Sequence, residues 1–155
     1  MEAIALKSGV TLVHIPYASS PQAVTALLRG DVQMACLPAI AVTPQAGPGK
    51  LKILAVSTPK RSAFLPDIPT LKEAGIDVEA DAWMGLVAPA GLPGAMITRI
   101  NQEVVEAIKT AEIREKLATQ LMEPIGNSPA EFRAQIEAEI GRWEPVIKAA
   151  GVRIN

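Results

Sequence analysis

Short apolar runs broken by glycine and proline fill the first half of the chain, from Gly9 to about Asp81. Residues 10–17 (VTLVHIPY) are β-branched and apolar on both faces, which is typical of a strand buried in a parallel sheet. Pro16 would end the pairing of that strand, because proline donates no backbone hydrogen bond. The same reasoning predicts extended segments at residues 32–37 (VQMACL), 51–57 (LKILAVS), 76–80 and 83–87 (WMGLV).

Two helices are predicted between these strands. Ser20 precedes Pro21, a residue that favours a first helical turn, so we expect Ser20 to cap a helix that runs through Arg29. Gly30 suits the end of this helix. Thr70 and Glu73 have the spacing of a capping box, which predicts a short helix over residues 71–74 that stops at the following glycine.

Beyond a segment rich in proline and glycine (residues 89–94) the apolar period becomes helical. One helix is expected to begin near Pro93, and a shorter one to surround residues 113–117. Ser128 and Glu131 again have capping-box spacing and open a third helix. Its apolar stripe needs a surface to pack against and comprises Phe132, Ile136, Ile140, Trp143 and Ile147.

Composition narrows the classes of protein. The 155 residues are 49% hydrophobic and 20% charged, with a formal net charge of −1, so the chain can bury enough apolar surface to fold and has no attraction for nucleic acid or anionic lipid. No run approaches the ~20 apolar residues of a membrane-spanning helix. Residues 1–12 include Glu2 and Lys7 and lack the pattern of a signal peptide.

Residues that could support catalysis or metal binding are few. Cys36 is the single cysteine and His14 the single histidine, so neither a disulfide within the chain nor a metal-ligand cluster is expected. His14 lies in a predicted strand, where we expect a buried, hydrogen-bonded imidazole, and Cys36 is expected to act as a small apolar residue. No serine lies in the sequence surroundings of a catalytic nucleophile. The sequence therefore disfavours a hydrolase or an isomerase, and no catalytic residue is expected.

One junction between a strand and a helix has the features of an anion site. Tyr17, Ala18, Ser19 and Ser20 precede a helix N-terminus, where unpaired N–H groups and the positive end of the helix dipole favour negative charge. Ligands of open α/β sheets also gather at the carboxyl ends of strands. The alternative is that Ser20 only caps its own helix, and the local pattern does not separate the two.

Five segments, in order, resemble the tripartite tricarboxylate transporter substrate-binding family, also called Bug or TctC-like receptors. They are VTLVHIPYASS, GDVQMACLPAIAV, LKILAVSTPKRSAFLPDIPTLKEAG, WMGLVAPAGLP and AEIGRWEPVIKAAGV. The resemblance covers essentially the whole chain. It implies an α/β, type II periplasmic-binding-protein-like lobe with a small, mostly parallel sheet and a helical C-terminal extension.

The resemblance also implies a function. Such receptors are periplasmic, need no cofactor, are not enzymes, and deliver a small carboxylate to membrane transporter subunits. The turn that matches Tyr17–Ser20 helps to hold the carboxylate through amides, hydroxyls and water. The turn at Leu37 and Pro38 also faces the cleft, but many relatives carry Asp or Asn there, so a carbonyl contact or a less polar ligand is expected at this position.

These receptors are about twice as long as this chain, which resembles the C-terminal half only. The matching assigns residues 1–81 to part of the second lobe, 82–92 to a strand and linker that cross the hinge, and 93–155 to helices of the first lobe. The strand that precedes residues 2–7 in the family is absent. We expect the helices to bury their stripe in a homo-oligomer, and the alternative function is a remnant that has lost transport and acts as an oligomeric scaffold or interaction module.

Overall fold

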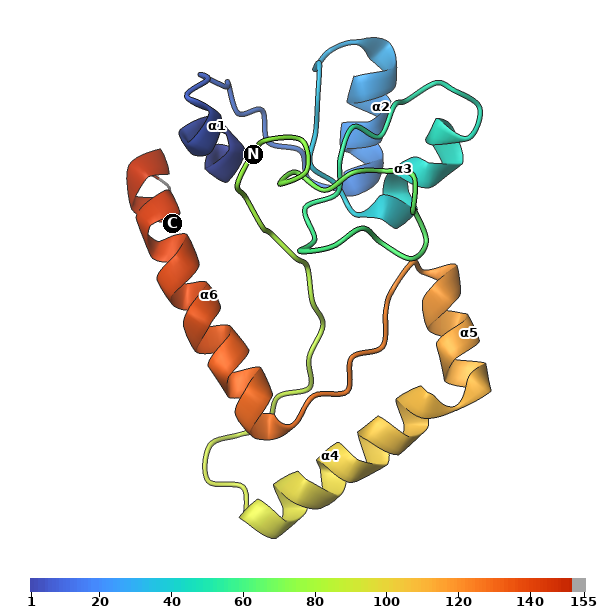
Figure 1. Cartoon of the computed structure of the whole chain (residues 1–155), viewed down its shortest axis with the longest axis vertical. Helices are drawn as coiled ribbons and strands as arrows, with labels where there is room; N and C mark the ends of the chain where they lie inside the picture. The colour runs from blue at the N-terminus through green and yellow to red at the C-terminus, as the bar shows by residue number, and fades with distance from the viewer. Residues whose placement is uncertain (152–155) are drawn as a thin grey trace. The chain divides into compact units, whose positions relative to one another are not determined.

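The computed structural model describes residues 1–151 and separates the chain into two compact units, Met1–Trp83 (unit 1) and Met84–Asn155 (unit 2). Within the described residues, unit 1 contains three α-helices and unit 2 contains three more (Figure 1). In chain order they are α1 (Glu2–Ser8), α2 (Ser20–Arg29), α3 (Ala39–Ala46), α4 (Gly94–Lys109), α5 (Ala111–Thr119) and α6 (Pro129–Ala150).

Unit 1 is organised around α2, which contacts α3. The buried face of α2 carries Ala23, Val24 and Ala26. As predicted, the helix extends to Arg29 and ends at Gly30. The φ of Gly30 is 77°, a value that only glycine adopts readily. Its N–H group bonds to the carbonyls of the preceding turn. The sequence pattern did not predict α3, and the helical run is obscured by Pro44 inside it.

The predicted strands are the main error of the sequence analysis. Within residues 1–151 no strand forms, and the only β-type pairing is an isolated parallel bridge between Val56 and Thr70. The bridge consists of a bond from Val56 N–H to the Pro69 carbonyl (2.9 Å) and one from Leu71 N–H to the Val56 carbonyl (2.9 Å). Apolar, β-branched runs predict strands only where a neighbouring strand supplies donors and acceptors. Residues 10–17 and 32–37 have no such neighbour among residues 1–151.

The capping box at Thr70 and Glu73 is confirmed, although it closes a turn rather than a helix. The Thr70 N–H donates to the Glu73 carboxylate at 2.7 Å, and the Glu73 N–H donates to the Thr70 hydroxyl at 3.1 Å. Residues 71–75 form a turn, which ends at Gly75. Thr70 is only 3% exposed, whereas residues 72–75 of the turn are exposed.

In unit 2 the predicted helices are confirmed. Helix α4 follows Pro93, α5 surrounds residues 113–117, and α6 begins after Ser128 with both bonds of its capping box present. Helix α4 contacts both α5 and α6. Asn101 of α4 donates to the Asn127 carbonyl at 3.0 Å and so fixes α4 to the loop that precedes α6.

The apolar stripe of α6 is only partly covered. Phe132 packs against the backbone at Gly85, where a Cβ atom would collide with the ring. Ile140 and Ile147 remain 64% and 49% exposed, as expected for a stripe without a partner. No helix in the described part of the chain is long and apolar enough to cross a membrane.

Candidate functional site

The turn before α2 is the candidate site that the sequence predicted. Ser19, rather than Ser20, is the N-cap, with extended backbone (φ −156°, ψ 156°), so the helix begins one residue earlier than expected. The Ser19 side chain makes no capping hydrogen bond. The structure therefore does not support the alternative in which a serine hydroxyl serves only to cap its own helix.

Backbone donors at this turn are also free. The Ala23 N–H bonds to the Ser19 carbonyl at 3.1 Å, but no acceptor within residues 1–151 faces the N–H groups of Ser20 and Gln22. Tyr17 and Ser19 are exposed, and Ser20 is half-buried. Free N–H groups beside two hydroxyls at the positive end of a helix can bind one carboxylate by charge-assisted hydrogen bonds.

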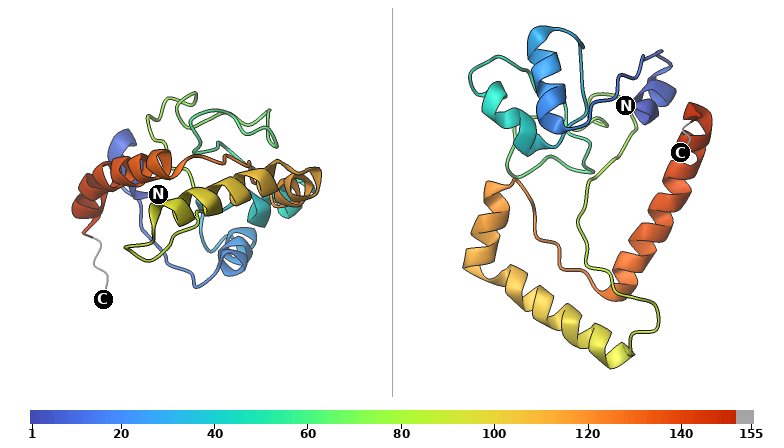
Figure 2. Two further views of the ribbon diagram at one scale, coloured as in Figure 1. Left: turned by 90° about the horizontal axis from the view of Figure 1, so that it is seen from below. Right: turned by 180° about the vertical axis from the view of Figure 1, so that it is seen from behind.

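The second predicted turn, at Leu37 and Pro38, opens α3. Pro38 is the N-cap and has no side-chain donor or acceptor, so only the first backbone N–H groups of α3 offer hydrogen bonds. The views of unit 1 agree that the N-terminal ends of α2 and α3 lie on the same side (Figures 1 and 2). Both helix N-termini can therefore contribute to one anion-binding face.

Two expectations about single residues are wrong. His14 is exposed and makes no hydrogen bond to residues 1–151, and Cys36 is exposed as a free thiol. Both predictions assumed that the surrounding segments would be central strands. Because those segments pair with nothing in this structure, the side chains meet water instead.

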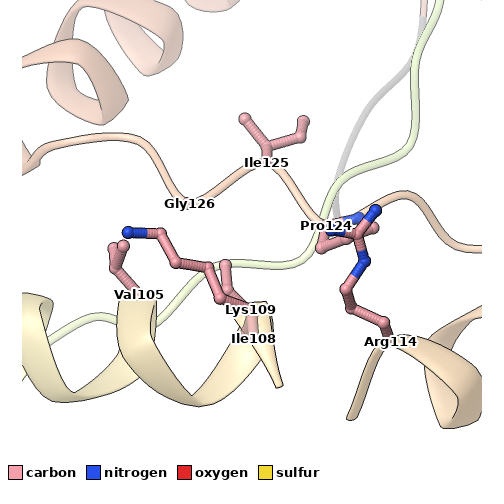
Figure 3. A pocket seen from close by; sticks show the side chains of 7 residues that line it. All are labelled: Val105, Ile108, Lys109, Arg114, Pro124, Ile125 and Gly126. Atoms are coloured by element: carbon pink, nitrogen blue, oxygen red, sulfur yellow. The ribbon is translucent and has the colours of Figure 1, made fainter. Parts of the chain in front are cut away.

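A cavity in unit 2 is a separate candidate. It has a volume of about 120 Å³, and in Figure 3 Arg114 extends toward Pro124 while Lys109 extends below Gly126. The Lys109 ammonium lies 3.3 Å from the Glu106 carboxylate, so part of its charge is already balanced. The other lining residues are apolar or glycine: Val105, Ile108, Ile125 and Gly126. Sequence reasoning did not single out this cavity, because its residues come from three separate segments.

The resolved pKa shifts belong to the fold rather than to either candidate site. The Arg61 guanidinium donates to both carboxylate oxygens of Glu73 (3.0 and 2.9 Å) and, with the Thr70 N–H, lowers the pKa of Glu73. The Ser128 N–H and hydroxyl lower the pKa of Glu131 in the same way. Both carboxylates hold chain turns in place.

Residues 1–152 match the family model described as the tripartite tricarboxylate transporter family receptor. The chain belongs to this family. It is 37% identical over 147 residues to the UPF0065 protein in the gbd 5' region of Cupriavidus necator, a match that covers 95% of this chain and 44% of that protein. The chain thus spans about half the length of the curated relatives it matches, consistent with their C-terminal half.

Solved structures support the same fold. R. palustris Rpa4515 with adipate is 34% identical and superposes with a TM-score of 0.81 over 97% of this chain and 50% of that one. MatC (Rpa3494) from Rhodopseudomonas palustris with bound malate is 28% identical, with a TM-score of 0.74 over 94% of this chain and 51% of the other. The resemblance to periplasmic binding proteins is confirmed for the path of the chain, and the sheet expected with it is absent from the described residues.

Proposed function

We propose that this chain is the C-terminal part of an extracytoplasmic solute-binding receptor and that it binds one carboxylate group of a small organic acid at the turn of Tyr17–Ser20. Family membership over residues 1–152 carries the proposal. In this assignment the receptor works in the periplasm and delivers its ligand to membrane transporter subunits. Residues 1–81 and 93–155 belong to different lobes, with 82–92 crossing the hinge.

The chemistry of the turn agrees with the ligands of two relatives. Adipate and malate, bound in those structures, are both dicarboxylic acids. A short helix N-terminus with free N–H groups and two hydroxyls matches a single carboxylate, so a second carboxylate needs other groups. Leu37 and Pro38 offer hydrogen bonds only through the backbone, and their apolar side chains suit the apolar middle of a ligand such as adipate.

Calorimetric titration with adipate, malate and citrate tests the proposal. We expect weak but measurable binding, because a site open on one side does not surround its ligand. Replacing Ser19 and Ser20 by alanine should weaken the binding free energy by about 1.5–3 kcal/mol for each hydroxyl that bonds to the carboxylate. Thr25→Ala is the matched control, since its hydroxyl bonds to the Pro21 carbonyl on the same helix (3.0 Å) and faces no ligand.

Heat that survives in the Ser19→Ala, Ser20→Ala double variant would move the site elsewhere, with the cavity beside Lys109 and Arg114 as the next candidate. Absence of heat with every acid would favour the alternative function, a remnant that serves as a scaffold. The same titration therefore separates the two functions.

A further inference from the structure

The cavity of unit 2 lies between the end of α4, the start of α5 and the loop that joins α5 to α6. Its volume is about 120 Å³, and none of the residues that line it is acidic. An engineered protein cavity of roughly 150 Å³ binds benzene, which has about six non-hydrogen atoms. The cavity of unit 2 therefore has room for a ligand of about five or six non-hydrogen atoms.

The two cations at this cavity differ in what already balances their charge. The Lys109 ammonium lies 3.3 Å from the Glu106 carboxylate. The Arg114 guanidinium, in contrast, has no ion pair and no hydrogen bond within residues 1–151, and Figure 3 shows it extending toward Pro124. A guanidinium presents a planar fork of donors that matches the two oxygens of a carboxylate. Arg114 is therefore the group at this cavity that is suited to bind an anion.

The rest of the lining is apolar and indicates what else the ligand carries. Val105 and Ile108 of α4 are half-buried, and Ile125 of the loop is 72% exposed. Covering an exposed isoleucine with a hydrocarbon group is favourable because it removes apolar surface from water. Phosphate or another wholly polar anion would bring no apolar group to these side chains. A carboxylate with a short hydrocarbon tail fits both the free guanidinium and the apolar wall.

The loop that closes the cavity is held at both ends. Leu121 has a φ of 55° and is the one residue other than glycine with a positive φ in the described part of the chain, a conformation that is costly for leucine. A bond from the Met122 N–H to the Leu117 carbonyl (3.0 Å) holds this turn. At the other end, Asn101 donates to the Asn127 carbonyl at 3.0 Å. Strained backbone of this kind persists where its surroundings fix it, and it is common at ligand sites.

Gly126 brings the same loop close to α4. Its φ is 67°, and a Cβ atom there would lie 2.8 Å from the Ile108 Cδ1 atom. A larger residue would therefore displace Ile108, which lines the cavity. The wall formed by the loop and α4 thus exists before any ligand binds, which lowers the cost of ordering the site on binding.

We propose that this cavity binds a short-chain monocarboxylate, with the carboxylate on the Arg114 guanidinium and the hydrocarbon tail against Ile108 and Ile125. One unpaired cation matches one carboxylate, and a second carboxylate would meet only a lysine whose charge Glu106 already balances. A monocarboxylate should therefore bind more tightly than a dicarboxylate with the same number of carbon atoms. The site lies in unit 2, whereas the turn at Tyr17–Ser20 lies in unit 1, so the inference does not rest on the proposed function.

Titration of the chain with acetate, propionate, butyrate and hexanoate, followed through methyl signals in NMR spectra, tests the proposal. We expect butyrate to shift the methyl signals of Val105, Ile108 and Ile125, and to leave that of Val24, which is buried on α2, in place. Affinity should rise about fourfold with each methylene from acetate to butyrate. It should rise no further with hexanoate, whose tail is longer than the cavity can hold. Because the signals report each unit separately, failure here is distinguishable from failure of binding at the turn before α2.

Variants at exposed positions assign the two parts of the ligand. Arg114→Gln should weaken butyrate binding at least about tenfold, and Arg114→Lys should restore part of that loss because it keeps the charge. Arg99→Gln is the matched control, since it removes the same charge from an exposed position of α4 that does not line the cavity, and it should leave the affinity unchanged. Ile125→Ala should reduce the gain in affinity from acetate to butyrate.

Several results would overturn the proposal. Equal affinity for all four acids, or for inorganic phosphate and butyrate, would mean that Arg114 attracts anions by charge alone. Equal losses in Arg114→Gln and Arg99→Gln would mean that the net charge of the chain, rather than the cavity, determines binding. Succinate that binds more tightly than butyrate would contradict the preference for one carboxylate. Methyl signals of the cavity that do not shift with any acid at millimolar concentration would exclude the site.

Discussion

At the scale of single residues, Gly85 shows why an exposed glycine can be indispensable. A Cβ atom there would overlap the Phe132 ring, so the ring packs on bare backbone. Gly141, inside α6, has open space around it. Gly85 lies in an extended segment and Gly141 in a helix, and of the two only Gly85 has a ring packed against it.

We expect Gly85→Ala to lower the free energy of unfolding of unit 2 by about 1–3 kcal/mol, since the ring must move to admit the methyl group. Gly141→Ala is the matched substitution and should raise it by about 0.5–1 kcal/mol, because alanine loses less backbone entropy in a helix. Urea unfolding followed by circular dichroism measures both. Equal effects of the two substitutions would contradict the packing of Phe132 on Gly85.

Glu73 is the residue through which unit 1 should respond to acid. Bonds from Arg61 and Thr70 lower its pKa in the folded state below 4.5, the ordinary value for a glutamate side chain. When the pKa of a carboxylate is lower in the folded than in the unfolded state, the carboxylate stabilises the fold at pH values above its unfolded-state pKa. This stabilisation is lost as the pH falls through the folded-state pKa.

Unit 1 is therefore expected to lose stability as the pH falls below about 4.5, and Glu73→Gln should weaken that dependence. The measurement is thermal unfolding between pH 3 and pH 7, roughly the range over which carboxylates titrate. Asp67→Asn is the control, since Asp67 is exposed and makes no ion pair among the described residues. An unchanged pH dependence in Glu73→Gln would assign the acid response to another group.

At the scale of elements, α2, α4, α5 and α6 were predictable from the sequence, whereas α3 was not, and the predicted strands do not form among residues 1–151. The pair Ser128 and Glu131 marks the beginning of α6 to within one helical turn. Pro93 marks the beginning of α4 equally closely. A helix bonds to itself, so local residues decide its ends. A strand bonds to a neighbour that sequence does not identify, and residues 32–37 have the composition of a strand without its pairing.

Ser128→Ala should shorten α6 at its start and lower the free energy of unfolding by about 0.5–2 kcal/mol, as expected for an N-cap whose hydroxyl bonds to the Glu131 N–H (3.2 Å). Loss of helical circular dichroism together with a lower urea midpoint would confirm it. Ser128→Thr retains a hydroxyl acceptor and should restore most of the loss. If Ser128→Thr lowered the free energy of unfolding as much as Ser128→Ala, the capping hydroxyl would not be what stabilises α6.

At the scale of the whole molecule, many large apolar side chains are exposed, and contiguous exposed apolar surface is typical of association sites. Exposed aliphatic side chains lie in the extended segment at residues 84–87 and along α4 and α6, where Met84 is 84% and Ile140 64% exposed. Burial of each such side chain in an interface would stabilise the associated state by roughly 1.5–3 kcal/mol. Self-association of the chain through its helices remains the prediction that follows from the sequence.

Light scattering at micromolar concentration tests this prediction, and we expect a mass above the 16.3 kDa of one chain. Replacing Ile140 and Ile147 by glutamate should return the mass to that of one chain, because buried charges without partners are costly. Ala138→Glu, an exposed position on the same helix, should leave the mass unchanged. A wild-type mass of one chain would exclude association through this stripe.

By itself, the sequence determined the features that depend on neighbours along the chain: the helix ends, the two capping boxes, and the turn where two hydroxyls meet a helix N-terminus. Only the tertiary structure decided which side chains meet water and which backbone groups are paired. His14 and Cys36 are exposed because the segments around them have no adjacent strand. Burial and sheet pairing join residues far apart in the chain, so residues near one another in the sequence do not decide them.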